Sequence, residues 1–382
     1  MNGYHLKNQQ VNLWIGIKSY YLRNILGATF AQIHFSSMQK LFLFTLLTSI
    51  LSTSAIAQDQ QFTQFYASPL SLNPALTGAV EGSYRVGTSY RDQWRKVLEN
   101  PIKTFSMFAD LRFDARKKKN NDDAIGLGIM FFNDKVSVVD FSTTQISVSM
   151  AYHKALGFNN KQYLSVGLQG GLTQRNVSYG ALYFHDQFDG NTGYSIPTSE
   201  TLPGNNFSYT DYSAGLNYTA EIGRDGHFFA GAAIHHFLQP NISFYENSGS
   251  GDKLFAKYSA QFAANLPLTK DNRSQIHPRL LVAVQGNHLQ INAGTNFRFA
   301  MGQYGSTALH LGAWARPVRN LDGFGLDAVV GLIGIERNDV LFGISYDLNI
   351  KAIQASQRQG ALEISITYLG NYDSQDIICP KF

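Results

Sequence analysis

Apolar and polar side chains alternate along several long segments of this chain. The clearest run is Leu362-Glu363-Ile364-Ser365-Ile366-Thr367-Tyr368, in which every second residue is apolar. A period of two residues is typical of a β-strand with one apolar and one polar face, so the pattern predicts an all-β protein. The period alone leaves two architectures open, because the apolar face is inside in a soluble β-sandwich but faces lipid in a transmembrane barrel. The same alternation is found in residues 144–153, 211–220 and 289–299.

The number and the length of the predicted strands favour the barrel. Their even number is typical of single-chain bacterial barrels, and most are longer than the roughly five or six residues of ordinary globular strands. We therefore predict a transmembrane antiparallel β-barrel of about 14 strands over residues 83–370. The predicted strands are 83–92, 103–113, 124–133, 141–154, 161–177, 206–222, 227–237, 253–268, 275–286, 289–300, 305–316, 323–335, 339–350 and 360–370.

The connections between these strands fall into two classes. Those after the fifth and seventh strands, at 178–205 and 238–252, are the longest, whereas five connections after even-numbered strands are short and turn-like. Outer-membrane barrels have short periplasmic turns and long external loops, so this order predicts both termini in the periplasm and a periplasmic C-terminal tail at 371–382. One exception is the connection after the second strand, which carries Lys117-Lys118-Lys119 and is predicted at about ten residues.

Residues 38–57 have the three parts of a secretory signal peptide. Met38-Gln39-Lys40 is a short basic start, residues 41–51 are apolar, and Ala55-Ile56-Ala57 precedes a predicted cleavage site after Ala57. The apolar run is too short to span a bilayer comfortably, which favours cleavage over a signal anchor. Residues 1–37 fit no part of this scheme. We interpret them as a mis-called upstream extension, with translation starting at Met38.

Composition excludes several other classes of protein. Four of the 31 basic residues and none of the 27 acidic residues lie in residues 1–57, so the remainder has no net formal charge, which removes the main support for nucleic-acid binding. The single cysteine, Cys379, allows no intramolecular disulfide and no Cys-rich zinc or iron–sulfur site. No cofactor is predicted. After the leader there is no apolar run of about 18 residues, so a membrane-spanning chain of this kind has to close a β-sheet on itself.

The histidines and serines show no local signature of an enzyme. His235 and His236 are adjacent in a predicted strand, so their side chains should point to opposite faces and ligate no metal jointly. A lipid hydrolase built on a barrel would need a serine and a histidine, such as His153, to meet across strands at the lipid face. We therefore predict that the protein is not an enzyme and keep the barrel lipid hydrolase as an alternative.

Residues 58–82 precede the first predicted strand and form a distinct N-terminal segment. They begin with polar residues and then contain Pro69, Pro74 and Gly78, which argues against a regular strand or a long helix. We predict an irregular segment that either plugs the barrel lumen or lies in the periplasm.

Several motifs, taken together, resemble the PorP/SprF family. The first is Gln58-Asp59-Gln60-Gln61-Phe62-Thr63-Gln64-Phe65-Tyr66-Ala67-Ser68-Pro69-Leu70-Ser71-Leu72-Asn73-Pro74-Ala75-Leu76-Thr77-Gly78, and the second is Tyr90-Arg91-Asp92-Gln93-Trp94. The others are Phe342-Gly343-Ile344-Ser345-Tyr346-Asp347-Leu348-Asn349, Leu362-Glu363-Ile364-Ser365 and the end Cys379-Pro380-Lys381-Phe382. The resemblance extends from residue 58 to the end of the chain. Its one departure is Gln60, where the family often has proline.

The resemblance implies an outer-membrane protein of the type IX secretion system of Bacteroidetes or of its gliding-motility branch. It also implies the partners: outer-membrane lipid, the C-terminal domain of a secreted adhesin, periplasmic type IX ring proteins and an OmpA-like peptidoglycan-binding subunit, with no nucleic acid. The polar lumen face keeps a second hypothesis open, a porin for solute diffusion or uptake.

The candidate site residues come from these motifs, and each has two interpretations. The turn at Asn73 and Pro74, with Gly78 after it, is either a structural seat in the barrel or a surface that binds a partner. Tyr90 and Trp94 either anchor the membrane interface or stack on a ligand. The remaining family-signature candidates are Arg91, Gln93, Cys379, Pro380 and Phe382, of which Cys379 either pairs with a partner thiol or packs as a terminal residue.

Overall fold

The computed structural model describes residues 59, 62–80, 82–95, 101–118, 121–136, 140–156, 161–191, 193–223, 225–245, 253–301, 307–320, 323–350 and 360–371. The chain divides into two units, Met1–Ala55 and Ile56–Phe382, and every described residue belongs to the second. The predicted upstream extension, the signal peptide with its cleavage site, and Cys379, Pro380 and Phe382 therefore lie outside the described residues.

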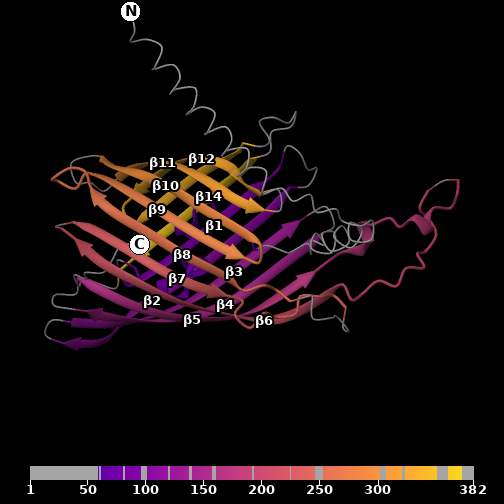
Figure 1. Ribbon diagram of the computed structural model, residues 1–382, viewed down its shortest axis with the longest axis horizontal. Helices are drawn as coiled ribbons and strands as arrows, with labels where there is room; N and C mark the ends of the chain where they lie inside the picture. Colours follow the sequence, from indigo (N-terminus) through magenta and orange to yellow (C-terminus); the bar gives the residue numbers. More distant parts are fainter. Residues whose placement is uncertain are drawn as a thin grey trace, which may run out of the picture. The chain divides into compact units, whose positions relative to one another are not determined.

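Fourteen antiparallel strands form one closed barrel, in which each strand pairs with its sequence neighbours and β1 pairs with β14 (Figure 1). This confirms the predicted all-β fold and its strand number. The strands are β1 (Tyr84–Gln93), β2 (Ile102–Lys118), β3 (Asn121–Val136), β4 (Phe141–Leu156), β5 (Gln162–Asn176), β6 (Asn206–Ile222), β7 (Gly226–His235), β8 (Lys257–Pro267), β9 (Ser274–Gln285), β10 (His288–Met301), β11 (Thr307–Asn320), β12 (Gly323–Arg337), β13 (Val340–Asn349) and β14 (Gly360–Gly370).

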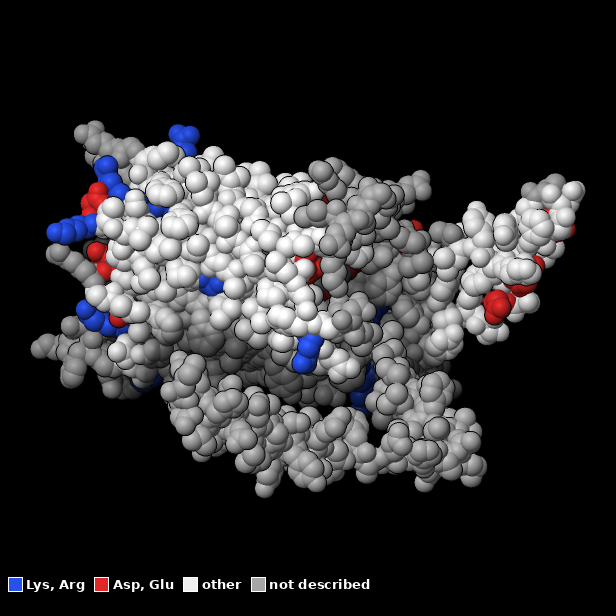
Figure 2. Space-filling view, turned by 45° about the horizontal axis from the view of Figure 1, so that its top comes forward, with Lys and Arg blue, Asp and Glu red and all other residues white. Residues whose placement is uncertain are grey.

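The apolar face of the strands points outward and the polar face points into the lumen. On β4, Val148 and Met150 are 60% and 55% exposed, whereas the intervening Ser147 and Ser149 are each 1% exposed. On the face seen in Figure 2 the outer wall is mostly uncharged, and most of the visible charged side chains lie towards the ends of the barrel. An apolar belt around a closed sheet is what the hydrocarbon of a membrane requires. Within the described residues, no helix has both the length and the apolar character needed to cross a membrane.

Strand parity separates the two ends of the barrel. The connections 177–205 and 236–256 lie at one end, which we call the long-loop end, and every connection at the other, the short-turn end, has six residues or fewer. The exception predicted after the second strand is wrong. Strand β2 continues to Lys118 and β3 begins at Asn121, with Lys117 opposite Asp122, so only two residues connect them.

Residues 62–80 and Asp59 lie inside the barrel, and we call them the luminal segment. The segment contains three short helical turns, η1 (Phe65–Ala67), α3 (Pro69–Leu72) and η2 (Pro74–Leu76). Its apolar side chains form the main hydrophobic core together with inward-facing residues of β9, β11 and β12. The core residues are Phe65, Leu72, Leu76, Ala79, Leu281, Trp314 and Val330.

The luminal segment runs from the long-loop end to the short-turn end. Asp59 contacts His236 and Lys257, the residues that flank the long connection between β7 and β8. At the other end, the N–H of Ser83 donates to the carbonyl of Gly370, the last residue of β14. Strand parity therefore places the start of β1 and the end of β14 correctly at one end. Strand parity predicts the wrong end of the barrel for Asp59, the beginning of the luminal segment, which lies at the long-loop end. Parity applies to strands and not to an irregular segment inside the lumen.

Candidate functional site

Asn73 fixes the middle of the luminal segment to the barrel wall. Its side-chain amide donates to the carbonyls of Leu216 on β6 and Ala232 on β7, at 2.9 and 3.3 Å. Its Oδ1 accepts the N–H of Ala75 at 2.9 Å and so caps η2, whose first residue is Pro74. Asparagine before proline favours such a turn because proline fixes the first helical φ and lacks an N–H. One side chain therefore both shapes the turn and attaches it.

Glycines on the barrel wall make room for the backbone of this turn. A Cβ atom added to Gly126 on β3 would lie 1.9 Å from the carbonyl oxygen of Thr77, and one added to Gly167 on β5 would lie 2.3 Å from the carbonyl carbon of Pro74. Gly78 itself has φ of +71°, a conformation that residues with a Cβ rarely adopt. These positions are therefore glycine because the luminal segment contacts the wall through backbone.

A buried network of charges holds the beginning of the luminal segment. The N–H groups of Thr63 and Gln64 donate to the carboxylate of Glu363 on β14, at 2.8 and 2.7 Å. Arg91 on β1 bridges this carboxylate to that of Asp347 on β13, at 3.1 and 2.8 Å. All of these side chains are buried. A buried charge is tolerated only when it is paired and hydrogen-bonded, and here the luminal segment completes the set.

A second buried pair holds the end of the segment. Arg85 on β1 forms a two-pronged interaction with Asp110 on β2, at 3.0 and 2.8 Å, and also donates to the carbonyl of Leu76 at 3.2 Å. The Oδ2 of Asp110, which accepts from Arg85, also accepts the N–H of Gly78 at 2.7 Å. The luminal segment is thus hydrogen-bonded to β1 and β14, the strands that close the barrel, and to β6 and β7 on the other side of the lumen.

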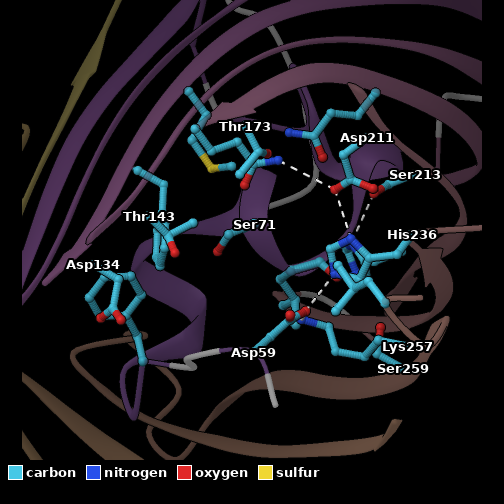
Figure 3. Close-up of a pocket in the computed structure, with 18 of the residues that line it drawn as sticks. Asp59, Ser71, Asp134, Thr143, Thr173, Asp211, Ser213, His236, Lys257 and Ser259 are labelled. Carbon is cyan, nitrogen blue, oxygen red and sulfur yellow. Dashed lines mark hydrogen bonds and ion pairs between the residues drawn. The ribbon is translucent and has the colours of Figure 1, made fainter. Parts of the chain in front are cut away.

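The first described residue is held by a histidine at the long-loop end (Figure 3). His236 contacts Asp59 and Asp211, at 2.6 and 2.8 Å, and Lys257 contacts Asp59 at 2.9 Å. Burial opposes the charge of Asp59, but Lys257 and His236 outweigh it and hold the pKa of Asp59 well below its usual value. Burial likewise opposes protonation of His236, yet Asp59 and Asp211 raise its pKa to about 9.

The predicted opposite orientation of His235 and His236 is wrong. Strand β7 ends at His235, and His236 has φ of +55°, so the alternation of side chains stops between them. Both rings consequently face the lumen, where His235 contacts the carbonyl of Leu72 at 3.3 Å. Among the described residues, no group of three or more His, Cys, Asp or Glu side chains is arranged to hold a metal ion.

A serine and a histidine do meet across strands, but not at the lipid face. His153 on β4 contacts the hydroxyl of Ser165 on β5 at 2.7 Å and the carbonyl of Thr77 at 2.8 Å. Both side chains are 2% exposed and are covered by the luminal segment. A lipid cannot reach this pair, so its chemistry is that of a hydrogen-bonded seat for Thr77.

Two cavities lie along the luminal segment. The first, of about 270 Å³, is at the long-loop end and is lined by Asp59, Phe65 and Leu72 of the segment. The second, of about 360 Å³, is at the short-turn end and is lined by Gln64, Tyr66 and Ala79. Different side chains of the same segment therefore line a cavity at each end of the barrel.

The predicted candidates separate into two groups. The first group is buried where the luminal segment meets the barrel wall and consists of Asn73, Pro74, Gly78 and Arg91. The second group lies at the rim of the barrel and consists of Tyr90, Gln93 and Trp94. Gln93 ends β1, and Tyr90 and Trp94 are half-buried there. Trp94 leaves the strand with φ of +62°, and its N–H donates to Gly360.

Sequence reasoning missed several residues that hold the segment. Asp110, Arg85 and Arg316 all form buried ion pairs in the lumen. The sequence did indicate that these residues are buried in pairs, because each is a charged residue at an inward position of a strand with alternating apolar and polar side chains. Such a residue has to find a partner in the lumen, but its partner cannot be named without the register.

The chain was compared with known proteins. The family model described as "Type IX secretion system membrane protein PorP/SprF" matches residues 54–368. No curated protein matches the chain. Among solved structures, the Pseudomonas putida toluene transporter TodX is similar at 13% identity and a TM-score of 0.48, covering 82% of this chain and 98% of that one. The Ralstonia pickettii toluene transporter TbuX is similar at 10% identity and a TM-score of 0.44, covering 80% and 94%.

Proposed function

Because the chain belongs to the PorP/SprF family of type IX secretion system membrane proteins, we propose that this outer-membrane barrel binds other proteins of that system and catalyses no reaction. Its partners in the proposal are the C-terminal domain of a secreted adhesin, the periplasmic ring proteins and an OmpA-like peptidoglycan-binding subunit. The short-turn end and the C-terminal tail face the periplasm, as in other outer-membrane barrels, and the long-loop end faces outward.

The observation that carries the proposal is the connection between β5 and β6, residues 177–205, which we call the projecting arm. It extends far beyond the ends of the strands (Figure 1). Its tip exposes a cluster of rings, in which Tyr183 and Phe188 both contact Tyr194, with centroids 5.2 and 5.5 Å apart. Tyr183 is 73% exposed. Exposed aromatic clusters of this kind are typical of surfaces that bind proteins.

The projecting arm is held in shape by its own hydrogen bonds. Asp186 accepts the N–H of Ser199 and the hydroxyls of Thr198 and Ser199, and Asp189 accepts the N–H groups of Asn191 and Gly193. An arm that is ordered before binding loses less conformational entropy when it binds. It contains three acidic residues and no Lys or Arg, so the proposed partner surface is apolar with a basic rim.

The seated luminal segment separates this proposal from the alternative of a diffusion porin. An open porin needs a water-filled passage through the lumen. Here buried ion pairs, backbone contacts at glycines and a hydrophobic core all fix the segment across that passage. These contacts support a barrel that presents surfaces to proteins more than one that admits solutes.

A pull-down tests the proposal. The full-length barrel in detergent is used to capture the C-terminal domains of type IX adhesins from the same organism, and a variant with Tyr183→Ser, Phe188→Ser and Tyr194→Ser is compared. We expect the variant to lose at least about 90% of capture, since aromatic side chains dominate binding energy. The control is Tyr245→Ser, which changes a ring that is 63% exposed in the connection between β7 and β8. Undiminished capture by the triple variant contradicts the role of the projecting arm.

A further inference from the structure

Arg279 on β9 is a buried cation without a counter-ion. Its side chain faces the lumen, and the residue is 9% exposed. Within the described part of the chain, its Nε and Nη1 have no hydrogen-bond partner and no carboxylate lies within ion-pair distance of it. Leaving a buried charge without a partner is costly, which is why Arg85 and Arg91 in the same lumen each have a carboxylate. Among the described residues, Arg279 is therefore a buried positive charge that no carboxylate balances.

The luminal segment orients this guanidinium without neutralising it. The guanidinium carbon lies 4.1 Å from the centre of the Tyr66 ring, and Tyr66 stacks on Trp314 with ring centres 5.9 Å apart. The hydroxyl of Tyr66 accepts from Asn296 at 3.0 Å. Burial raises the pKa of Tyr66 to about 12, so its hydroxyl is protonated at neutral pH and supplies no negative charge. The stack fixes where Arg279 lies and leaves its charge unbalanced.

Arg279 lines the cavity of about 360 Å³ at the short-turn end. The other two arginines that line it are already balanced. Arg298 contacts both oxygens of Glu336 at 2.8 and 2.7 Å, and Arg85 pairs with Asp110 at 2.8 Å. Asp339 lines the same cavity and is exposed. One uncompensated positive charge, in a cavity that an exposed acid also lines, suits a ligand with a single negative charge and disfavours a dianion.

We propose that Arg279 and the surrounding cavity bind a carboxylate that enters from the short-turn end. A carboxylate presents two oxygens in the plane that a guanidinium recognises, and it has the single charge that the cavity lacks. The cavity volume is within the usual range for small-ligand sites, of roughly 300–1,000 Å³. The carboxylate comes either from a small free acid or from the end of a peptide chain. The proposal does not rest on the secretion role, since it concerns a different end of the barrel from the projecting arm.

The first test compares four probes on the full-length barrel in detergent micelles. These are acetate, N-acetyl-dialanine with a free carboxylate, the same dipeptide as its carboxamide, and inorganic phosphate. Binding is followed by the fluorescence change of the tryptophans, since Trp314 stacks on Tyr66, and by the thermal unfolding midpoint. We expect the free carboxylates to bind and the carboxamide to bind at least about tenfold more weakly, because a hydrogen bond to a guanidinium is stronger when the acceptor is charged.

The relative affinities of acetate and of the dipeptide carboxylate identify the source of the ligand. Equal binding of acetate and dipeptide carboxylate indicates a small free acid, and tighter binding of the dipeptide indicates a chain end. Both support the site. Binding of the carboxamide as tightly as the acid overturns the proposal, as does binding of phosphate alone or of no probe. This comparison uses the unaltered protein, so it does not depend on the folding of any variant.

The second test changes the arginine. We expect Arg279→Gln to weaken carboxylate binding at least about tenfold and to leave the unliganded unfolding midpoint unchanged or higher, because an unpaired buried charge is removed. The matched control is Arg112→Gln, since Arg112 is also buried in the lumen over a tyrosine ring but lines neither cavity. Carboxylate binding that survives Arg279→Gln contradicts the site.

Discussion

The carbonyl oxygen of Thr77 occupies the place where a side chain of Gly126 would begin, 1.9 Å from the ideal Cβ position. Neither atom can move freely, because Gly126 lies in the middle of β3 and Thr77 donates through its hydroxyl to Ser149 at 2.9 Å. The contact shows that the barrel wall and the luminal segment fit each other at the level of backbone atoms.

This contact predicts the effect of a single methyl group. We expect Gly126→Ala to displace the luminal segment and to lower stability by about 1–3 kcal/mol, the usual cost of overpacking. Gly331→Ala on β12 is the control, since a Cβ there meets no atom within 4 Å. Thermal unfolding of both variants in detergent measures the difference. Equal midpoints would show that the luminal segment yields at this point without cost.

The buried network at the seam predicts a larger loss. Arg91→Leu leaves the carboxylate of Glu363 without its arginine, and breaking a buried pair in this way costs about 3–5 kcal/mol. We therefore expect a lower unfolding midpoint and a luminal segment that proteases cleave more readily. Adding Glu363→Gln to Arg91→Leu should recover part of the loss, because the amide needs no counter-ion. A double variant no more stable than Arg91→Leu contradicts this account.

The hold on Asp59 predicts a pH dependence. The pKa of His236 is raised to about 9. The stability that protonated His236 adds is therefore fully present below its ordinary pKa of about 6.5 and is lost as the pH rises through 9. The pKa of Asp59 is lowered, so its contribution is present above its ordinary value and is lost only as the pH falls through the folded one. We expect the unfolding midpoint to fall between pH 7 and pH 9.5.

The control for this pH effect is His236→Asn, which tolerates the left-handed backbone at that position. The variant should lose less stability than the unaltered protein over the same interval, because the groups common to both cancel. The prediction fails if the two proteins fall by the same amount.

The seated segment also predicts low conductance. In a background with Cys379→Ser, the pair Thr77→Cys and Ser149→Cys should form a disulfide, since the two hydroxyls are 2.9 Å apart. We expect single-channel conductance in planar bilayers to be low with this disulfide and to rise when residues 62–80 are deleted. High conductance of the oxidised protein would instead favour the porin alternative, because solute would then pass a fixed luminal segment.

Strand positions were predictable from the sequence because one face of each strand must be apolar. Most of the predicted strand limits lie within two residues of those observed. The largest error, at the end of β2 and the beginning of β3, arose because residues 114–123 show no alternation of apolar and polar side chains, although Lys117 lies opposite Asp122 in the sheet. His236 escaped prediction because its left-handed φ leaves no trace in the residue pattern.

The contacts inside the lumen were not predictable in the same way. Thr63 and Glu363 are separated by 300 residues, and the sequence indicates only that each inward charge needs some partner. Asn73-Pro74 was recognisable as a turn, since asparagine before proline shapes one locally. That its amide would bond to β6 and β7 depended on the path of the luminal segment, which no local pattern records.

The strands that close the barrel, β1 and β14, come from opposite ends of the folded chain, so joining them is the least local step in forming the sheet. The luminal segment directly precedes β1 in sequence and grips Glu363 on β14 through two of its backbone N–H groups. It therefore links the last strand to the first by hydrogen bonds that are independent of the pairing of β1 with β14. A chain without residues 62–80 should therefore close its barrel and enter membranes more slowly than the full chain, although the closed barrel is the end state of both.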